Sequence, residues 1–159
     1  GLDTIAKPLF KKLSSYSKDF SIKPILVNSF DQDKLRSQSQ MVEYYQGIDL
    51  FISTSHRFSE GTPNPAFEAA SCGIPVISTE NGSIKDLVKN GINGYTVPGW
   101  TTEKEAEISL DKIKEYILKL EADRPLLREL GENSRKEVLA NWRWADRARA
   151  YSELFLVNG

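Results

Sequence analysis

The spacing of apolar residues changes several times along the chain and predicts alternating helices and strands. Apolar residues recur at helical spacing over residues 4–13 and again over 41–45, where Gly47 would end the second helix. Short apolar runs between polar segments are typical of buried strands. The predicted strands are residues 25–27, 50–52, 75–78 and 95–97.

Two short helices are predicted between the later strands. Asn64 before Pro65 has the pattern of a helix N-cap followed by a proline in the first turn, and Gly73 would stop this helix. Residues 83–88 form the second helix, and the Asn-Gly pairs after it predict turns.

The last third of the chain is predicted to be helical. An apolar stripe begins at Leu110, and Pro125 opens a further helix that Gly131 is expected to interrupt. A last stripe places Trp144 in the core; its members are Trp144, Ala148, Tyr151 and Phe155. Strands that alternate with helices predict an α/β fold, a Rossmann-like parallel sheet with helices on both faces. The 159 residues are expected to form a single domain, 1–159.

Composition and charge narrow the classes of function. The chain has 40% hydrophobic and 27% charged residues, which is typical of a globular protein. Its net charge of −1 gives no basic field for a nucleic-acid backbone, so no nucleic-acid partner is expected. Cys72 is the single cysteine, which excludes an internal disulfide and fits a cytoplasmic location. Because the sequence begins with Gly1 and not Met, we expect it to be part of a longer protein.

The loop before Pro65 is the strongest candidate for a binding site. In an open parallel sheet, ligands bind beyond the carboxyl ends of the strands, and this loop leaves a strand there and enters a helix N-terminus. The N–H groups of a helix N-terminus lack intrahelical partners and carry the positive end of the helix dipole. The pattern favours a diphosphate-binding loop made of Gly61, Thr62, Pro63 and Asn64, although many α/β proteins have such a loop for structural reasons alone.

Two carboxylates flank this loop. Glu68, one turn into the helix, can accept hydrogen bonds from the 2′- and 3′-hydroxyls of a ribose. Its neighbours are apolar or small, which favours this role over that of a solvent-facing residue. Glu60, just before the loop, is the candidate catalytic residue beside a transferred sugar.

The whole stretch resembles the signature of family 4 glycosyltransferases, which have the GT-B fold. That signature has two Glu residues separated by seven others, as Glu60 and Glu68 are here. Further segments similar to the family occur in order along most of the chain. They are GLD at 1–3, YQGID at 45–49, GIPVI at 73–77, NGINGYTV at 90–97 and NWRW at 141–144.

The resemblance implies that the chain is the donor-binding, C-terminal half of a retaining glycosyltransferase in glycan or glycoconjugate biosynthesis. Its ligand would be a nucleotide-diphosphate sugar, bound with no cofactor and no divalent metal. The sequence agrees, since it has no Asp-x-Asp motif and no histidine cluster suited to a metal. His56, the single histidine, is expected to be a surface or packing residue.

The chain departs from the family pattern in two ways. The family's phosphate-binding Lys would precede Gly1 on a first strand, and the N-terminal acceptor domain is missing as well, so the chain alone is expected to fold but to transfer no sugar. Thr62 stands where the family often has Phe, which leaves the donor sugar open, as are the base and the acceptor. Peripheral attachment to the inner face of a membrane through the full-length protein is also open.

Two other classes of protein remain as alternatives. A GT-B-like sugar-nucleotide epimerase shares the diphosphate-binding loop but usually carries more acid–base residues on the same half. A non-catalytic α/β interaction domain of the receiver or flavodoxin type should not bind a nucleoside diphosphate. A receiver also needs an acidic cluster at its strand ends, which the apolar strands do not supply.

Overall fold

The computed structural model of the chain describes residues 7–14, 37–56 and 61–156. Its helices are α1 (Lys7–Ser14), α2 (Gln38–Gln46), α3 (Asn64–Ser71), α4 (Ile84–Leu87), α5 (Glu103–Ala122), α6 (Arg124–Asn141) and α7 (Trp144–Leu156). Its strands are β1 (Phe51–Ser53), β2 (Val76–Thr79) and β3 (Gly94–Val97). The strand predicted at 25–27 lies outside the described residues.

The three strands form a parallel sheet in the order β1-β2-β3. In the centre of the sheet, Ile77 of β2 is in register with Ile52 of β1 and Tyr95 of β3. Every residue of β2 and β3 is buried, as expected for a parallel sheet covered on both faces. Because the strands are parallel, they end at one edge, which we call the carboxyl edge.

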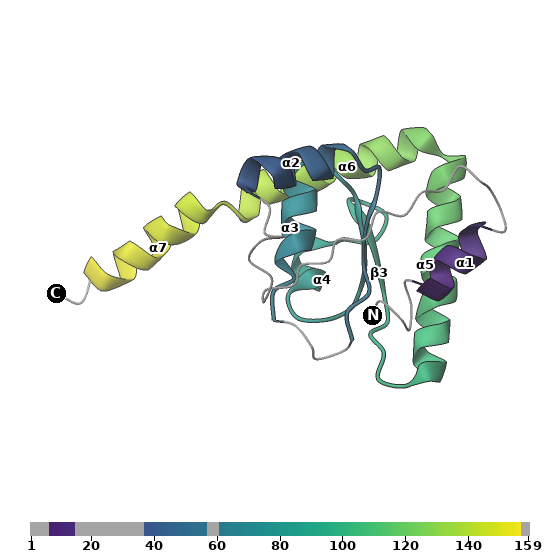
Figure 1. The fold of residues 1–159 in the computed structure, drawn as a ribbon. Helices are drawn as coiled ribbons and strands as arrows, with labels where there is room; N and C mark the ends of the chain where they lie inside the picture. The colour runs from purple at the N-terminus through teal and green to yellow at the C-terminus, as the bar shows by residue number, and fades with distance from the viewer. Residues whose placement is uncertain (1–6, 15–36, 57–60, 157–159) are drawn as a thin grey trace.

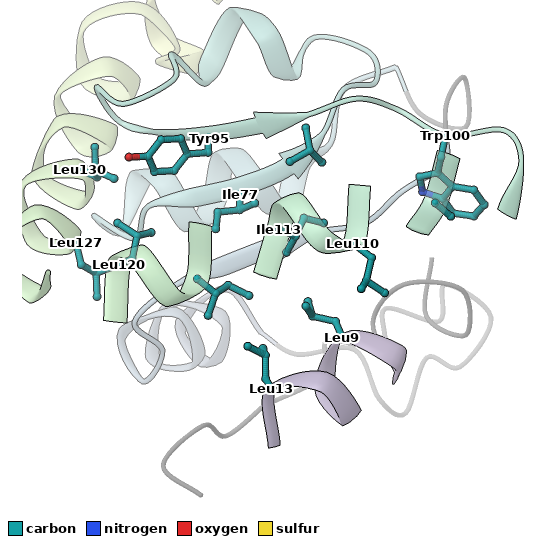
Figure 2. Close-up of a cluster of buried hydrophobic side chains, with 13 residues drawn as sticks. Leu9, Leu13, Ile77, Tyr95, Trp100, Leu110, Ile113, Leu120, Leu127 and Leu130 are labelled. Carbon is teal, nitrogen blue, oxygen red and sulfur yellow. The ribbon is translucent and has the colours of Figure 1, made fainter. Parts of the chain in front are cut away.

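Helices cover both faces of this sheet (Figure 1). On one face, α1 and α5 enclose a cluster that includes Leu9, Ile77 and Ile113 (Figure 2). On the other face, α2, α3 and α4 enclose a second cluster that includes Tyr45 and Val76. Successive side chains of a strand point to opposite faces, so Val76 and Ile77 belong to different clusters. The predicted Rossmann-like fold is confirmed.

Helix α5 begins earlier than the apolar stripe predicted. Its N-cap is Thr102, whose hydroxyl accepts a hydrogen bond from the Glu105 N–H at 3.3 Å. The Glu105 carboxylate accepts in return from the N–H groups of Thr101 (2.8 Å) and Thr102 (3.2 Å). These bonds, led by that from Thr101, lower the pKa of Glu105. This capping box starts the helix at Glu103, and the pattern Thr-x-x-Glu was its signal in the sequence.

Gly131 does not interrupt α6, which corrects the prediction. The helix is continuous from Arg124 to Asn141, and Gly131 lies in its buried side against Gly73. A Cβ atom at position 131 would clash with the carbonyl oxygen of Gly73. Gly73 itself follows α3 with a φ of 80°, so it ends that helix as predicted. Gly131 therefore permits the end of α3 and the middle of α6 to approach closely.

The prediction that Trp144 lies in the core is wrong. Its side chain is 86% exposed, Phe155 is 79% exposed, and Ala148 and Tyr151 are also exposed. Helix α7 extends away from the rest of the molecule (Figure 1). The spacing of apolar residues shows which ones share a helix face, but not whether anything packs on that face. No helix within the described ranges is long and apolar enough to cross a membrane.

We predict that Gly131→Ala lowers the free energy of unfolding by about 1–3 kcal/mol, because the new methyl group overpacks the contact with Gly73. The sign of this change tests the contact, since Gly→Ala in an unconstrained helix interior raises the free energy of unfolding by about 1 kcal/mol. Urea denaturation would measure the change. Exposed Glu132 offers the control, since Glu132→Ala should change stability by less than about 0.5 kcal/mol. A stabilised Gly131→Ala variant would show that the contact does not need glycine.

Candidate functional site

The loops that follow the three strands are joined at the carboxyl edge. The hydroxyl of Thr79, at the end of β2, donates to the Ser55 carbonyl beyond β1 at 2.7 Å. The N–H of Glu80 donates to the carbonyl of Val97, at the end of β3, at 2.8 Å. Ligands of open parallel sheets bind at this edge, so the edge is the candidate site.

The predicted diphosphate-binding loop is anchored here by the loop after β2. The N–H of Ser83 donates to the carbonyl of Gly61 at 2.8 Å, and the hydroxyls of Ser83 and Thr62 lie 3.4 Å apart. Gly61 and Thr62 are exposed, and their own N–H groups donate to nothing in the described part of the chain. The loop backbone is thus held through the Gly61 carbonyl, and the N–H groups of Gly61 and Thr62 can donate to a ligand.

The start of α3 differs from the prediction in one respect. Pro63 and not Asn64 occupies the N-cap position, and no side chain caps the helix. The N–H of Asn64 donates to the Thr62 carbonyl at 2.9 Å, and that of Ala66 donates to the Pro63 carbonyl at 2.9 Å. Pro63 and Pro65 have no N–H at all. The N-terminus of α3 therefore offers fewer donors than a typical helix, and anion binding would depend mainly on Gly61 and Thr62.

Of the two predicted carboxylates, the structure describes only Glu68. It lies on α3 with its side chain exposed, and its Oε2 accepts a hydrogen bond from the Tyr45 hydroxyl at 2.9 Å. Tyr45 belongs to the last turn of α2, a contact that the sequence analysis missed. Glu60 lies outside the described residues, and its catalytic role stays a prediction.

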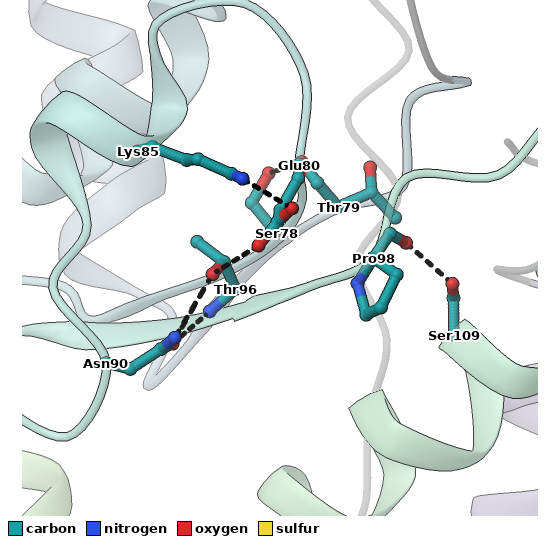
Figure 3. A network of polar contacts seen from close by, with 8 residues as sticks. All are labelled: Ser78, Thr79, Glu80, Lys85, Asn90, Thr96, Pro98 and Ser109. Atoms are coloured by element: carbon teal, nitrogen blue, oxygen red, sulfur yellow. Dashed lines mark hydrogen bonds and ion pairs between the residues drawn. The ribbon is translucent and has the colours of Figure 1, made fainter.

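A polar network supports the loop after β2 (Figure 3). Glu80 forms an ion pair of 2.7 Å with Lys85 and accepts a hydrogen bond from the Thr96 hydroxyl at 3.4 Å. The Asn90 side chain in turn accepts from the Thr96 N–H at 2.6 Å. Asn93 accepts from the Lys89 N–H and donates to a backbone carbonyl. The two asparagines of the NGINGYTV segment are thus occupied by structural hydrogen bonds.

Two residues that the sequence analysis did not assign to the site lie in the loops beyond the sheet. Among the described residues, the buried side-chain polar atoms without a hydrogen-bond partner are both amide atoms of Asn81 and the indole Nε1 of Trp100. Asn81 follows β2 and is 6% exposed; Trp100 follows β3 and contacts the His56 ring edge to face at 4.8 Å. The signal for Asn81 was its position as a polar residue two positions after the end of a buried strand.

Other reactive groups have structural surroundings. Cys72 is partly buried against the cluster formed by α2, α3 and α4, where it serves as a packing residue. In the part of the chain that is described, no three His, Cys, Asp or Glu side chains lie close enough together to hold a metal ion.

Comparison with known proteins identifies the family. The family model described as "Glycosyl transferases group 1" matches residues 34–137, well over half of the chain. The chain belongs to this family. The resemblance noted in the sequence is thereby confirmed at the family level.

Curated relatives of this glycosyltransferase domain act on different molecules, to judge by their names. The capsular polysaccharide biosynthesis glycosyltransferase CapM of Staphylococcus aureus is 33% identical over 104 residues, which are 65% of this chain and 25% of CapM. A probable sucrose-phosphate synthase of Thermosipho melanesiensis is 31% identical over 124 residues, which are 76% of this chain and 26% of the synthase. The chain thus spans about a quarter of the length of each.

Solved structures share the GT-B type of fold. The C-terminal domain of a glycosyl transferase group 1 family protein (LpcC) from Francisella tularensis matches 87% of this chain and 63% of its own, with a TM-score of 0.61 and 21% identity. The Anabaena protein HepE, solved in complex with UDP, matches 72% of this chain and 29% of its own, with a TM-score of 0.63 and 17% identity.

Two buried asparagines in this glycosyltransferase domain provide a matched test of the site. Asn93→Leu should lower the free energy of unfolding by about 2–4 kcal/mol, because it leaves a buried backbone donor and acceptor unpaired. Asn81→Leu should leave stability unchanged or raise it by up to about 2 kcal/mol, because it removes a buried amide that has no partner. Chemical denaturation of both variants would measure the difference. Equal destabilisation would show that the Asn81 amide is paired in solution.

Proposed function

We propose that this chain is the donor-binding half of a retaining glycosyltransferase that transfers a sugar from a nucleotide-diphosphate donor without a metal. The observation that carries the proposal is the exposed backbone of Gly61 and Thr62 at the carboxyl edge of the sheet, in a chain of the group 1 family. The site lies where open parallel sheets bind nucleotides. The acceptor, the base and the sugar are not part of the proposal.

The leaving diphosphate would be stabilised by the loop and by α3. The N–H groups of Gly61 and Thr62 supply hydrogen bonds, and the α3 dipole places partial positive charge at the same end. Because Ser83 holds the Gly61 carbonyl, these donors are ordered before a ligand arrives. Donors that need no reorganisation stabilise developing charge most effectively, which allows them to replace a metal ion.

The two carboxylates would bind different parts of the donor. Glu68 would accept hydrogen bonds from the ribose hydroxyls, since it is exposed and one of its oxygens has no partner in the described structure. Glu60 would lie beside the transferred sugar and act in catalysis. Structures of similar fold support a nucleotide ligand, since HepE was solved in complex with UDP and with UDP-glucose.

The remaining parts of the enzyme would lie in a longer protein. This is supported by the quarter of each relative's length that the chain spans. The exposed apolar residues of α7, among them Trp144 and Phe155, suit contact with the acceptor domain of the same protein. The proposed phosphate-binding Lys would also come from outside these residues.

Thermal unfolding with a panel of nucleoside diphosphates tests the proposed function. A nucleotide present at 100 times its Kd should stabilise the chain by about 2.7 kcal/mol, which corresponds to a rise of roughly 5–10 °C in Tm. UDP, ADP, GDP, CDP and dTDP should differ, because the base contributes to binding. An interaction domain of the receiver or flavodoxin type would show no shift with any of them, and such a result would refute the proposal.

Substitution of Glu68 tests its role in ribose binding. Hydrogen bonds to charged groups contribute about 1.5–3 kcal/mol, so Glu68→Ala should weaken nucleoside diphosphate binding by roughly 10- to 150-fold in calorimetric titration. Glu68→Gln should lose less, since it keeps an acceptor both for the ribose and for Tyr45. Glu60→Ala is the matched control and should lose much less, because its proposed partner is the sugar. Equal losses at both positions would remove the assigned role.

A further inference from the structure

The contact between Tyr45 and Glu68 joins a buried side chain to an exposed one. Tyr45 is 1% exposed, yet its hydroxyl reaches Glu68 Oε2 on the surface of α3 at 2.9 Å. The two residues come from different helices and are separated by 23 positions in the sequence. This hydrogen bond therefore forms only when α2 and α3 pack together.

Tyr45 has little freedom to move. Its ring contacts Phe51 of β1 edge to face, with ring centroids 6.2 Å apart, and Tyr44 in the same manner at 5.9 Å. The helix that carries it is fixed at its start by a capping box between Ser37 and Gln40, and it ends at Gly47. The hydroxyl of Tyr45 is therefore a rigid donor.

The hydrogen bond between Tyr45 and Glu68 has a fixed direction, with Tyr45 as the donor. Burial raises the pKa of Tyr45 well above its ordinary value, and the hydrogen bond to Glu68 raises it further. The phenol therefore keeps its proton at physiological pH and always donates. The Glu68 side chain is exposed and has three rotatable bonds, and the hydrogen bond from Tyr45 restricts the position of its carboxylate.

We propose that Tyr45 is a positioning residue, which holds Oε2 of Glu68 so that Oε1 faces the ribose of a bound nucleoside diphosphate. The proposal rests on the proposed function, since it needs Glu68 to bind the ribose. Without Tyr45, the Glu68 side chain would have to be ordered when the nucleotide binds. Ordering one such side chain reduces affinity by roughly 2- to 10-fold.

The experiment uses Tyr45→Phe, which removes the hydroxyl and keeps the ring packing. UDP, ADP and GDP are titrated calorimetrically against the wild-type chain and the variant, together with the 2′,3′-dideoxy form of whichever binds most tightly. Tyr45→Phe should weaken binding of that ribonucleotide by roughly 2- to 10-fold and leave binding of the dideoxy nucleotide unchanged. Tyr116→Phe is the matched control, because Tyr116 lies on α5 and packs with the cluster on the other face of the sheet.

A double variant separates positioning from a structural role. In a Glu68→Ala background, Tyr45→Phe should have a smaller effect on the ribonucleotide, since the carboxylate that it positions is gone. Equal losses for the ribonucleotide and the dideoxy nucleotide would show that the fold of the site, and not Glu68, depends on Tyr45. That result overturns the inference.

Two further outcomes distinguish the inference from the function on which it rests. Unchanged affinity in Tyr45→Phe, together with a clear loss in Glu68→Ala, overturns the positioning role and leaves the proposed function intact. Absence of binding of UDP, ADP and GDP to the wild-type chain overturns both.

Discussion

The pairing of β2 with a parallel neighbour on each side is the constraint on which the rest of the structure depends. A strand buried at every position has no solvent-facing side, so helices must cover both faces of the sheet. Val76 packs with α2, α3 and α4 on one face of the sheet, and Ile77 packs with α1 and α5 on the other. Since all the strands end at one edge, the loops that follow them converge there, and that edge becomes the place for a ligand.

The elements that the sequence predicted well are those whose signal is local. Burial on both faces requires short, continuously apolar strands, and β2 lies within one residue of its prediction. The predictions were wrong where contacts between residues far apart in the sequence determine the structure. Gly131 has a poor helix propensity but is needed against Gly73, and Trp144 has the spacing of a core residue on a helix that extends away from the core. The apolar stripe missed the first turn of α5 because that turn is mostly polar, and the capping box was the local signal for it.

The same distinction applies to the candidate site. A strand, a loop with Gly61 and a helix that starts near Pro65 are adjacent in the sequence, so the location of the site could be predicted from order alone. The engagement of the Asn64 N–H by the Thr62 carbonyl could not, because it depends on how the two prolines turn the backbone. The contact of Tyr45 with Glu68 depends on the packing of two helices, and no periodicity within either helix encodes it.

The distribution of hydrogen bonds gives an independent argument for the carboxyl edge. Away from it, buried polar side chains are paired: Asn93 bonds the backbone of the α4 end, and Ser134 donates to the Asn93 carbonyl. The buried atoms without partners in the described chain belong to Asn81 and Trp100, in the loops that follow β2 and β3. A buried amide left without any partner costs about 1–3 kcal/mol, so these atoms need a hydrogen bond from a ligand or a water. The atoms without protein partners and the sheet topology therefore indicate the same edge.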